Sequence, residues 1–268
     1  MSITLTSVIA DPPSGRSRAV LFDHHDYAQR IILQGKDVPW DPPMAYSNFY
    51  SQAQSLLTAD VAVLDLGRYY GHCLEQETSL NESMGAKPRT GFALRTLLGD
   101  PQLVQRAQEL TTTFTKTQSA PVVLQIPSPM QWLGWTHHHV GAPGAADLDA
   151  DDAEKASMYV ADWVRSFAGL DLAGVLLDER QMLDVDLPSV DVSVYSPVAN
   201  VTEYYRWPLA RRHADRVELI GQEEVGGVLT ANFWLTEDMQ LPEGDFLMTE
   251  IPRSAAPEEV VARVSLLS

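Results

Sequence analysis

Three charged residues, Asp178, Glu179 and Arg180, directly follow a short apolar run at residues 175–177. Carboxylates at the rim of a buried strand are costly unless they are paired or used in chemistry. Two neighbouring carboxylates can also divide the roles of general acid and general base between them. We therefore predict that Asp178 and Glu179 are catalytic and that Arg180 binds the substrate. An ion pair of Arg180 with one of the carboxylates is the structural alternative.

Two histidine clusters carry side chains that could bind a substrate or a metal ion. Residues 23–26 read Asp-His-His-Asp, and residues 137–139 are three histidines. Adjacent residues of a strand point to opposite faces, so we expect only one of His24 and His25 to reach a shared ligand. We predict that His24 is catalytic and that residues 137–139 lie in a loop that could cover the substrate. Metal binding by either cluster is the alternative, but we expect neither a metal nor a cofactor.

Other catalytic motifs are missing or weak in this sequence. The chain has no Walker-type phosphate loop, no GxSxG elbow and no GxGxxG fingerprint. These absences argue against nucleotide-dependent enzymes and serine hydrolases. Cys73 is the only cysteine and follows His72. We expect a buried thiol there, with a nucleophile as the alternative.

The charge of the chain limits its partners. With 19 basic and 36 acidic residues the formal net charge is −17, so phosphate backbones and anionic lipids are repelled. The sequence shows neither a signal peptide at its start nor an apolar run of transmembrane length. We expect a cytoplasmic protein that takes a small-molecule substrate, with no nucleic acid and no membrane as partner. A homodimer is also possible from the sequence.

The elements that must position these residues are indicated by apolar runs. Most of the runs lack polar alternation, which is typical of strands buried on both faces of a parallel sheet. Eight strands are predicted, at residues 19–22, 61–64, 122–126, 175–177, 190–195, 217–220, 228–233 and 246–248. Helices are predicted at residues 46–57, from Asp100-Pro101 onward, over 151–167, over 204–212 and from Pro257 onward.

This alternation predicts the fold class. Eight strands with helices between them favour an α/β protein with a single (β/α)8 TIM barrel. The barrel would span residues 17–268, and residues 1–16 would form an N-terminal arm. Residues 181–189 and 221–227 are too short or too broken for full crossover helices. We therefore expect reduced helices after strands 4 and 6.

In such barrels the active site lies at the carboxyl ends of the strands. Polar residues just after each predicted strand are therefore the candidates, and they include Asp65 after strand 2 and Glu250 after strand 8. The residues predicted to bind the substrate are Arg68, Gln125, Ser128, Trp132, Arg180, Tyr195, Asn232 and Arg253.

Several of these segments, in this order, resemble a known superfamily of barrels. Residues 34–64, 121–132, 174–179 (Gly-Val-Leu-Leu-Asp-Glu) and 251–263 are similar to segments of the C-terminal domain of cobalamin-independent methionine synthase. The same superfamily holds uroporphyrinogen decarboxylase and zinc alkyl-thiol transferases. The resemblance implies a TIM barrel that binds a small molecule.

One departure from the family pattern bears on the chemistry. The zinc-dependent members carry His-x-Cys before a Tyr-Ser on the fifth strand, whereas Val192-Ser193-Val194 precedes Tyr195-Ser196 here. The resemblance therefore implies a metal-independent lyase, decarboxylase or isomerase that acts on a small organic acid. In it Arg68, Arg180 and Arg253 would hold the anion. The alternatives are a metal-dependent methyl or alkyl transferase or hydrolase that uses histidine ligands, and a non-catalytic binding barrel.

Overall fold

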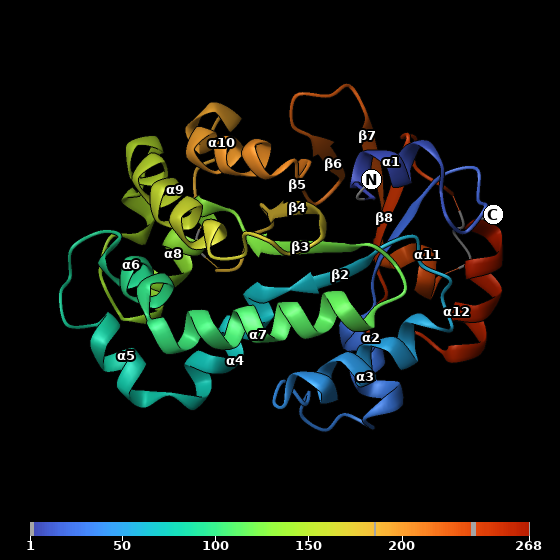
Figure 1. Cartoon of the computed structure of the whole chain (residues 1–268), viewed down its shortest axis with the longest axis horizontal. Coiled ribbons are helices and arrows are strands. Elements are labelled where there is room, and N and C mark those ends of the chain that lie inside the picture. Colours follow the sequence, from blue (N-terminus) through green and yellow to red (C-terminus); the bar gives the residue numbers. More distant parts are fainter. Residues whose placement is uncertain (1–2, 185, 237–239, 268) are drawn as a thin grey trace.

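Eight strands form one sheet at the centre of the molecule, and helices surround it (Figure 1). This computed structural model describes residues 3–184, 186–236 and 240–267. The strands are β1 (Val20–Asp23), β2 (Ala62–Asp65), β3 (Val122–Pro127), β4 (Leu172–Asp178), β5 (Leu209–Arg212), β6 (Arg216–Leu219), β7 (Val225–Leu229) and β8 (Phe246–Glu250). Their order in the sheet is β1-β8-β7-β6-β5-β4-β3-β2, and β1 also approaches β2. The sheet is therefore nearly closed, and the predicted α/β barrel is confirmed.

The helices lie between the strands in the chain and outside them in space. They are α1 (Leu5–Ala10), α2 (His25–Ile32), α3 (Pro43–Gln54), α4 (Leu66–Gln76), α5 (Thr78–Met84), α6 (Phe92–Gly99), α7 (Pro101–Thr117), α8 (Pro129–His139), α9 (Ala150–Arg165), α10 (Ser196–Tyr205), α11 (Ala231–Leu235) and α12 (Pro257–Val264). Short 3-10 helices occur at η1 (Ala145–Asp147), η2 (Val192–Tyr195) and η3 (Ser265–Leu267). Helix α7 begins as predicted, because the Asp100 side chain accepts from the Leu103 amide and Pro101 opens the first turn.

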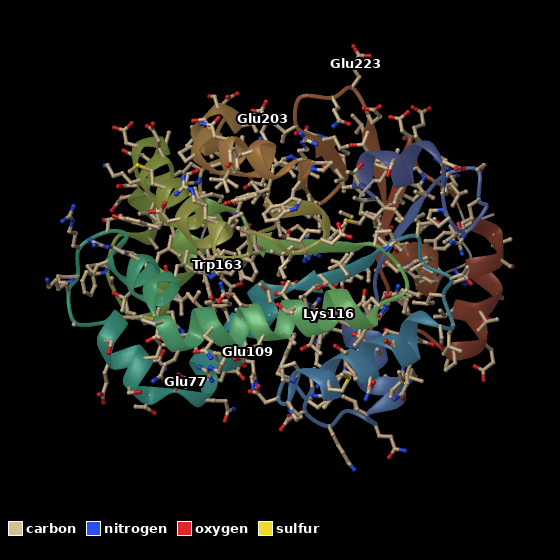
Figure 2. The ribbon with its side chains drawn as sticks, in the orientation of Figure 1. Glu77, Glu109, Lys116, Trp163, Glu203 and Glu223 are labelled. Carbon is tan, nitrogen blue, oxygen red and sulfur yellow. The ribbon has the colours of Figure 1, made fainter. Side chains whose placement is uncertain are left out.

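The strands bury apolar side chains on both faces. Leu21, Val63 and Val123 belong to a cluster inside the barrel. Residues one position further along the chain, such as Phe22 and Leu64, pack outward against the helices. In Figure 2 Glu203 and Glu223 project away from the body, and both side chains are exposed. Part of the acidic excess of the sequence therefore lies on the outer surface in contact with solvent, as expected for a highly charged protein.

The fifth strand lies later in the chain than predicted. Residues 190–195 carry the 3-10 helix η2, and the predicted helix at 204–212 ends early, with α10 stopping at Tyr205. Arg206 adopts a left-handed conformation with φ of 60°, and β5 follows at Leu209. The helix prediction was wrong because Leu-Ala-Arg-Arg carries strong helix formers. Tertiary ion pairs of Arg211 and Arg212 accompany the extended form instead. The strand prediction was wrong because the alternating valines of residues 190–195 are typical of a strand, whereas η2 forms there.

Strand β6 departs from the parallel pattern. It pairs antiparallel with both β5 and β7, whereas the other five strand pairs of the described chain are parallel. Short turns at residues 213–215 and 220–224 leave no room for crossover helices, so only an antiparallel strand can be reached. The predicted lack of a full helix after strand 6 is confirmed. Residues 181–184 and 186–189 are also without a helix, but α10 then completes the connection from β4 to β5.

Two further boundaries were wrong. The predicted strand at 228–233 ends at Leu229, and α11 begins at Ala231. Residues 137–139 form the last turn of α8 rather than a loop.

The N-terminal segment, expected as an arm, contains the packed helix α1. Residues 1 and 2 of that arm lie outside the described part. The Thr4 hydroxyl caps α1, and both Leu5 and Val8 are buried. They share the apolar cluster inside the barrel at the end opposite the carboxyl ends of β1 to β4. Within the described residues, no helix combines the length and apolar character needed to cross a membrane.

Replacing Leu5 by Ala tests whether α1 is part of the barrel core. Leu5 is fully buried, so we expect the free energy of unfolding to fall by about 2–4 kcal/mol. Ile3→Ala is the matched control, because Ile3 is 55% exposed and its loss should cost less than about 0.5 kcal/mol. Urea unfolding monitored by circular dichroism measures both. Equal stabilities of the two variants would contradict this role of α1.

Candidate active site

Polar side chains fill the barrel interior just above its apolar layer. Because side chains alternate along a strand, a residue two positions after an inward-facing residue also points inward. The inward apolar residues are Leu21, Val63, Val123, Leu176, Ala210 and Met248. Two positions after each of them come Asp23, Asp65, Gln125, Asp178, Arg212 and Glu250, which we call the mouth cluster. With the exception of Gln125, each of these six residues is the last of its strand.

Arg212 holds the centre of the mouth cluster and is only 1% exposed. Its Nη1 donates to Asp23 Oδ2 at 3.3 Å and to Gln125 Oε1 at 3.2 Å. Its Nη2 donates to Glu250 Oε2 at 3.2 Å. One guanidinium thus joins three strands across the barrel. Sequence reasoning missed Arg212 because the segment was assigned to a helix.

Arg68 and Arg180 also contact the mouth cluster, and both side chains are partly exposed. Arg68, on α4, donates to Asp26 Oδ1 at 2.5 Å and contacts Asp23 at 3.4 Å. Arg180 donates through Nη2 to Asp178 Oδ2 at 2.8 Å and through Nη1 to Glu250 Oε2 at 2.5 Å. Every carboxylate of the mouth cluster therefore has a guanidinium within 4 Å.

Two buried carboxyl groups of the mouth cluster have pKa values shifted in opposite directions. Burial raises the pKa of Asp65, and the charges of Asp23 and Asp178 add to this, while Arg68 opposes it. Burial would also raise the pKa of Asp23, but Arg68 and Arg212 outweigh it and hold that pKa well below its usual range. The cluster thus pairs a carboxyl group that retains its proton more strongly with one that loses its proton more readily.

Glu179 points to the other side of the sheet from Asp178. Its Oε1 accepts from Arg211 Nη2 at 2.8 Å, and its Oε2 accepts from the Ser128 hydroxyl at 2.7 Å. Tyr195, which is fully buried, lies 3.5 Å from the same oxygen. Glu179 and Arg211 thus form an ion pair that is mostly buried, and the hydroxyl groups of Ser128 and Tyr195 hydrogen-bond to its carboxylate. Adjacent residues of an extended chain face opposite sides, so Asp178 and Glu179 do not share one site.

The other predicted site residues lie away from the mouth cluster. Trp132 is fully buried, with its ring 5.4 Å from Tyr70. Asn232 is exposed on α11, and Arg253 is exposed beyond β8. His24 is 1% exposed, its ring lies 4.4 Å from that of Tyr50, and neither ring nitrogen has a hydrogen-bond partner. Of the predicted residues, the structure brings together Arg68, Gln125, Asp178 and Arg180.

His25 and His137 have local partners, and Cys73 is a buried free thiol. His25 Nδ1 lies 3.3 Å from Asp26 Oδ1, and its ring stacks on Trp40 at 5.4 Å. His137 Nε2 lies 2.8 Å from the Pro143 carbonyl oxygen. Burial raises the pKa of Cys73 to about 11, which disfavours a thiolate nucleophile. Across residues 3–184, 186–236 and 240–267, no three His, Cys, Asp or Glu side chains converge so as to hold a metal ion.

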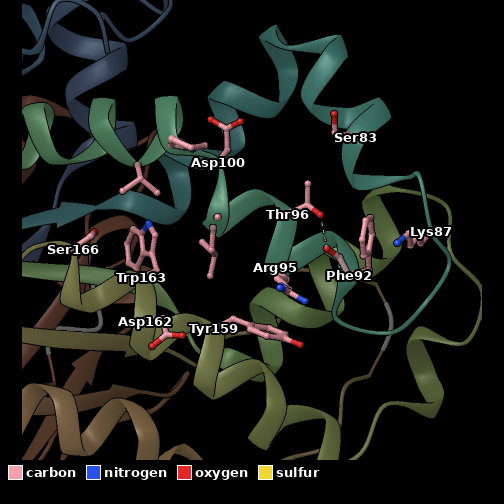
Figure 3. Close-up of a pocket in the computed structure, with 14 residues that line it drawn as sticks. Ser83, Lys87, Phe92, Arg95, Thr96, Asp100, Tyr159, Asp162, Trp163 and Ser166 are labelled. Carbon is pink, nitrogen blue, oxygen red and sulfur yellow. Dashed lines mark hydrogen bonds between the residues drawn. The ribbon is translucent and has the colours of Figure 1, made fainter.

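Two hollows are relevant to ligand binding. One, of about 350 Å³, opens at the barrel mouth and is lined by Arg180, Arg212, Glu250 and residues of the β5–β6 turn and of β7. A larger one, of about 870 Å³, lies outside the barrel among α6, α7 and α9 (Figure 3). Only the smaller one contacts the mouth cluster, so it is the candidate active site.

The burial of His24 can be tested through the pH dependence of stability. Burial lowers the pKa of His24 to about 4, whereas an unfolded histidine titrates near 6.5. The unfolded chain therefore binds a proton first, and stability is lost as the pH falls from about 6.5 towards 4. We expect His24→Phe to keep its stability at pH 7 and to remove up to about 3 kcal/mol of this acid-dependent loss. Urea unfolding across this range, with the exposed His138→Phe as control, measures it, and an unchanged pH dependence would contradict the burial.

Comparisons of the chain with family models, with curated proteins and with solved structures found no match. The resemblance to the methionine synthase and uroporphyrinogen decarboxylase barrels therefore stays a prediction from short motifs. A function is therefore proposed from the side chains at the barrel mouth.

Proposed function

We propose that this chain is an enzyme that binds a small organic acid at the barrel mouth and transfers a proton with a carboxylate. One observation carries the proposal. Arg180 and Arg212 both donate to the same oxygen of Glu250, at 2.5 and 3.2 Å, and all three side chains line the mouth hollow. Two guanidiniums that converge on one carboxylate oxygen form an anion site, and Glu250 occupies it in the free protein.

A substrate carboxylate can replace Glu250 at this site. The Glu250 side chain is 34% exposed and that of Arg180 is 32% exposed, so both can move without opening the core. Arg212 is held by Asp23 and Gln125 and stays in place. The exchange keeps both guanidiniums paired with a carboxylate, which avoids leaving a buried charge without a partner. The hollow of about 350 Å³ limits the substrate to a small molecule.

The displaced Glu250 then serves as the general base. It takes a proton from the carbon next to the bound carboxylate, and the electron pair moves onto the substrate oxygens held by Arg180 and Arg212. Preorganised guanidiniums stabilise that developing negative charge. Glu250, which now carries the proton, returns it to the substrate in the second step, so the proton balance closes on one residue.

Isomerisation and elimination start from such a carbanion; decarboxylation reaches a similar carbanion by loss of CO2 from a second carboxylate instead of loss of a proton, and the same guanidiniums would stabilise it. The proposal is therefore an isomerase or a lyase, decarboxylases included, that acts on a small organic acid without a metal. Cellular location in the cytoplasm belongs to the same proposal. The metal-dependent alternative gains no geometric support from the described residues. A non-catalytic binding barrel would use the same arginines but would need no base. A variant of Glu250 therefore distinguishes an enzyme from a binding protein.

Variants of Arg180 and Glu250 test binding and chemistry separately. In a screen of small mono- and dicarboxylates by thermal shift and isothermal calorimetry, we expect Arg180→Gln to weaken the best ligand at least about tenfold. Glu250→Gln removes the competing carboxylate, so it should bind that ligand as tightly as wild type or more tightly.

Turnover of the same ligand, or exchange of its carbon-bound proton with deuterium followed by NMR, reports the chemistry. Glu250→Gln should lose this activity while it retains binding. Arg253→Gln, an exposed arginine outside the mouth cluster, is the matched control and should change neither property. Equal effects of Arg180→Gln and Arg253→Gln on binding would contradict the site. Retained proton exchange in Glu250→Gln would contradict its role as base.

A further inference from the structure

A second hollow lies on the outside of the barrel, among α5, α6, α7 and α9. Its volume is about 870 Å³, within the range of sites that take small molecules. Figure 3 shows its walls, with Asp100, Trp163, Tyr159, Phe92 and Lys87 arranged around the opening. None of the mouth-cluster residues lines it, so it is a separate feature from the candidate active site.

Three aromatic side chains, those of Phe92, Tyr159 and Trp163, line the hollow. Trp163 is 3% exposed, and its Nε1 donates to the Tyr70 hydroxyl at 2.6 Å, which fixes the indole. Tyr159 lies against the backbone at the start of α6, because a Cβ added at Gly91 would be 3.4 Å from its Cε2. Phe92 lies across the opening, near Lys87 (Figure 3). Rings held in place in this way can pack against a planar ligand at little entropic cost.

Two cations at this hollow lack a carboxylate partner. Lys87 Nζ lies 5.3 Å from the centre of the Phe92 ring, and Arg95 extends from α6 beside Tyr159 (Figure 3). Within the described chain neither has a carboxylate within 4 Å, although Asp100 and Asp162 line the same hollow. Asp100 caps α7, and Asp162 pairs with Arg165. In a chain of net charge −17, unpaired cations beside an aromatic wall mark a place where an anion is accepted.

We infer that this hollow binds a planar aromatic anion. Its rings lie against Phe92, Tyr159 and Trp163, and its carboxylate, sulfonate or phosphate group pairs with Lys87 and Arg95. Aromatic contact and charge act together here, so neither a neutral aromatic molecule nor a small inorganic anion binds as well. The inference does not depend on the chemistry proposed for the barrel mouth.

A pair of fluorescent probes tests both parts of the inference. 8-Anilinonaphthalene-1-sulfonate carries the aromatic system and the anion, and N-phenyl-1-naphthylamine is its neutral counterpart. We expect the sulfonate to bind saturably at one site per chain, and to bind more weakly as salt is added. The double variant Lys87→Ala, Arg95→Ala should weaken it about tenfold, whereas the neutral probe should be unaffected. Arg89→Ala, an exposed arginine of the same segment that does not line the hollow, is the control.

A second variant fills the hollow instead of changing its charge. Gly99 is the last residue of α6 and lines the hollow, and a Cβ there would meet no atom within 4 Å. Gly99→Trp therefore fits the fold, which thermal unfolding verifies, and it should abolish binding of the sulfonate probe. Sulfonate binding that is unchanged in Gly99→Trp or in the double variant would overturn the inference. A dimer of the wild type in sedimentation that Gly99→Trp dissociates would also overturn it, because a second copy of the chain would then occupy the hollow.

Discussion

Buried charge at the end of the barrel is the constraint on which the rest of the structure depends. Asp23, Asp65, Asp178 and Glu250 end four strands and point into one space. Their mutual repulsion in a low-dielectric interior would open the barrel unless cations lay among them. Arg212 enters this space from the sheet itself, and Arg68 and Arg180 enter from the segments that follow β2 and β4. The same pairing that stabilises the barrel also leaves two guanidiniums at an open mouth.

Much of this arrangement could be predicted from the sequence, and the exceptions have physical causes. Continuous apolar runs indicated β1 to β4 and β8, because strands buried on both faces leave a strong local signal. The strand after β4 was harder to predict, because Leu209–Arg212 has helical propensity. The ion pairs that Arg211 and Arg212 make in the strand involve carboxylates distant in sequence, so they leave no local signal. The opposite placement of Asp178 and Glu179 could have been found, because strand alternation alone requires it. The burial of the His24 ring could not be predicted, because it depends on how α3 packs against that ring.

The antiparallel strand β6 explains where the mouth hollow opens. A parallel barrel surrounds every strand with a crossover helix, but β5, β6 and β7 are joined by two short turns. The turn at residues 213–215 therefore lies at the mouth, and His213 and Ala214 form part of the lining together with Thr230 and Ala231 at the start of α11. The rim beside Arg212 and Glu250 is thus formed by a short turn on one side of the barrel.

The position of α1 has a consequence for how the chain is made. This helix is synthesised before β5, β6 and β8, yet Leu5 and Val8 share an apolar cluster with Ala210, Val217 and Phe246 of those strands. The Thr6 hydroxyl likewise meets its partner only when Gln222 has emerged, 216 residues later. The packing of α1 is therefore incomplete until those strands have been synthesised. The nascent chain must avoid aggregation during that interval, and α1 is secured only after the later strands of the barrel have formed.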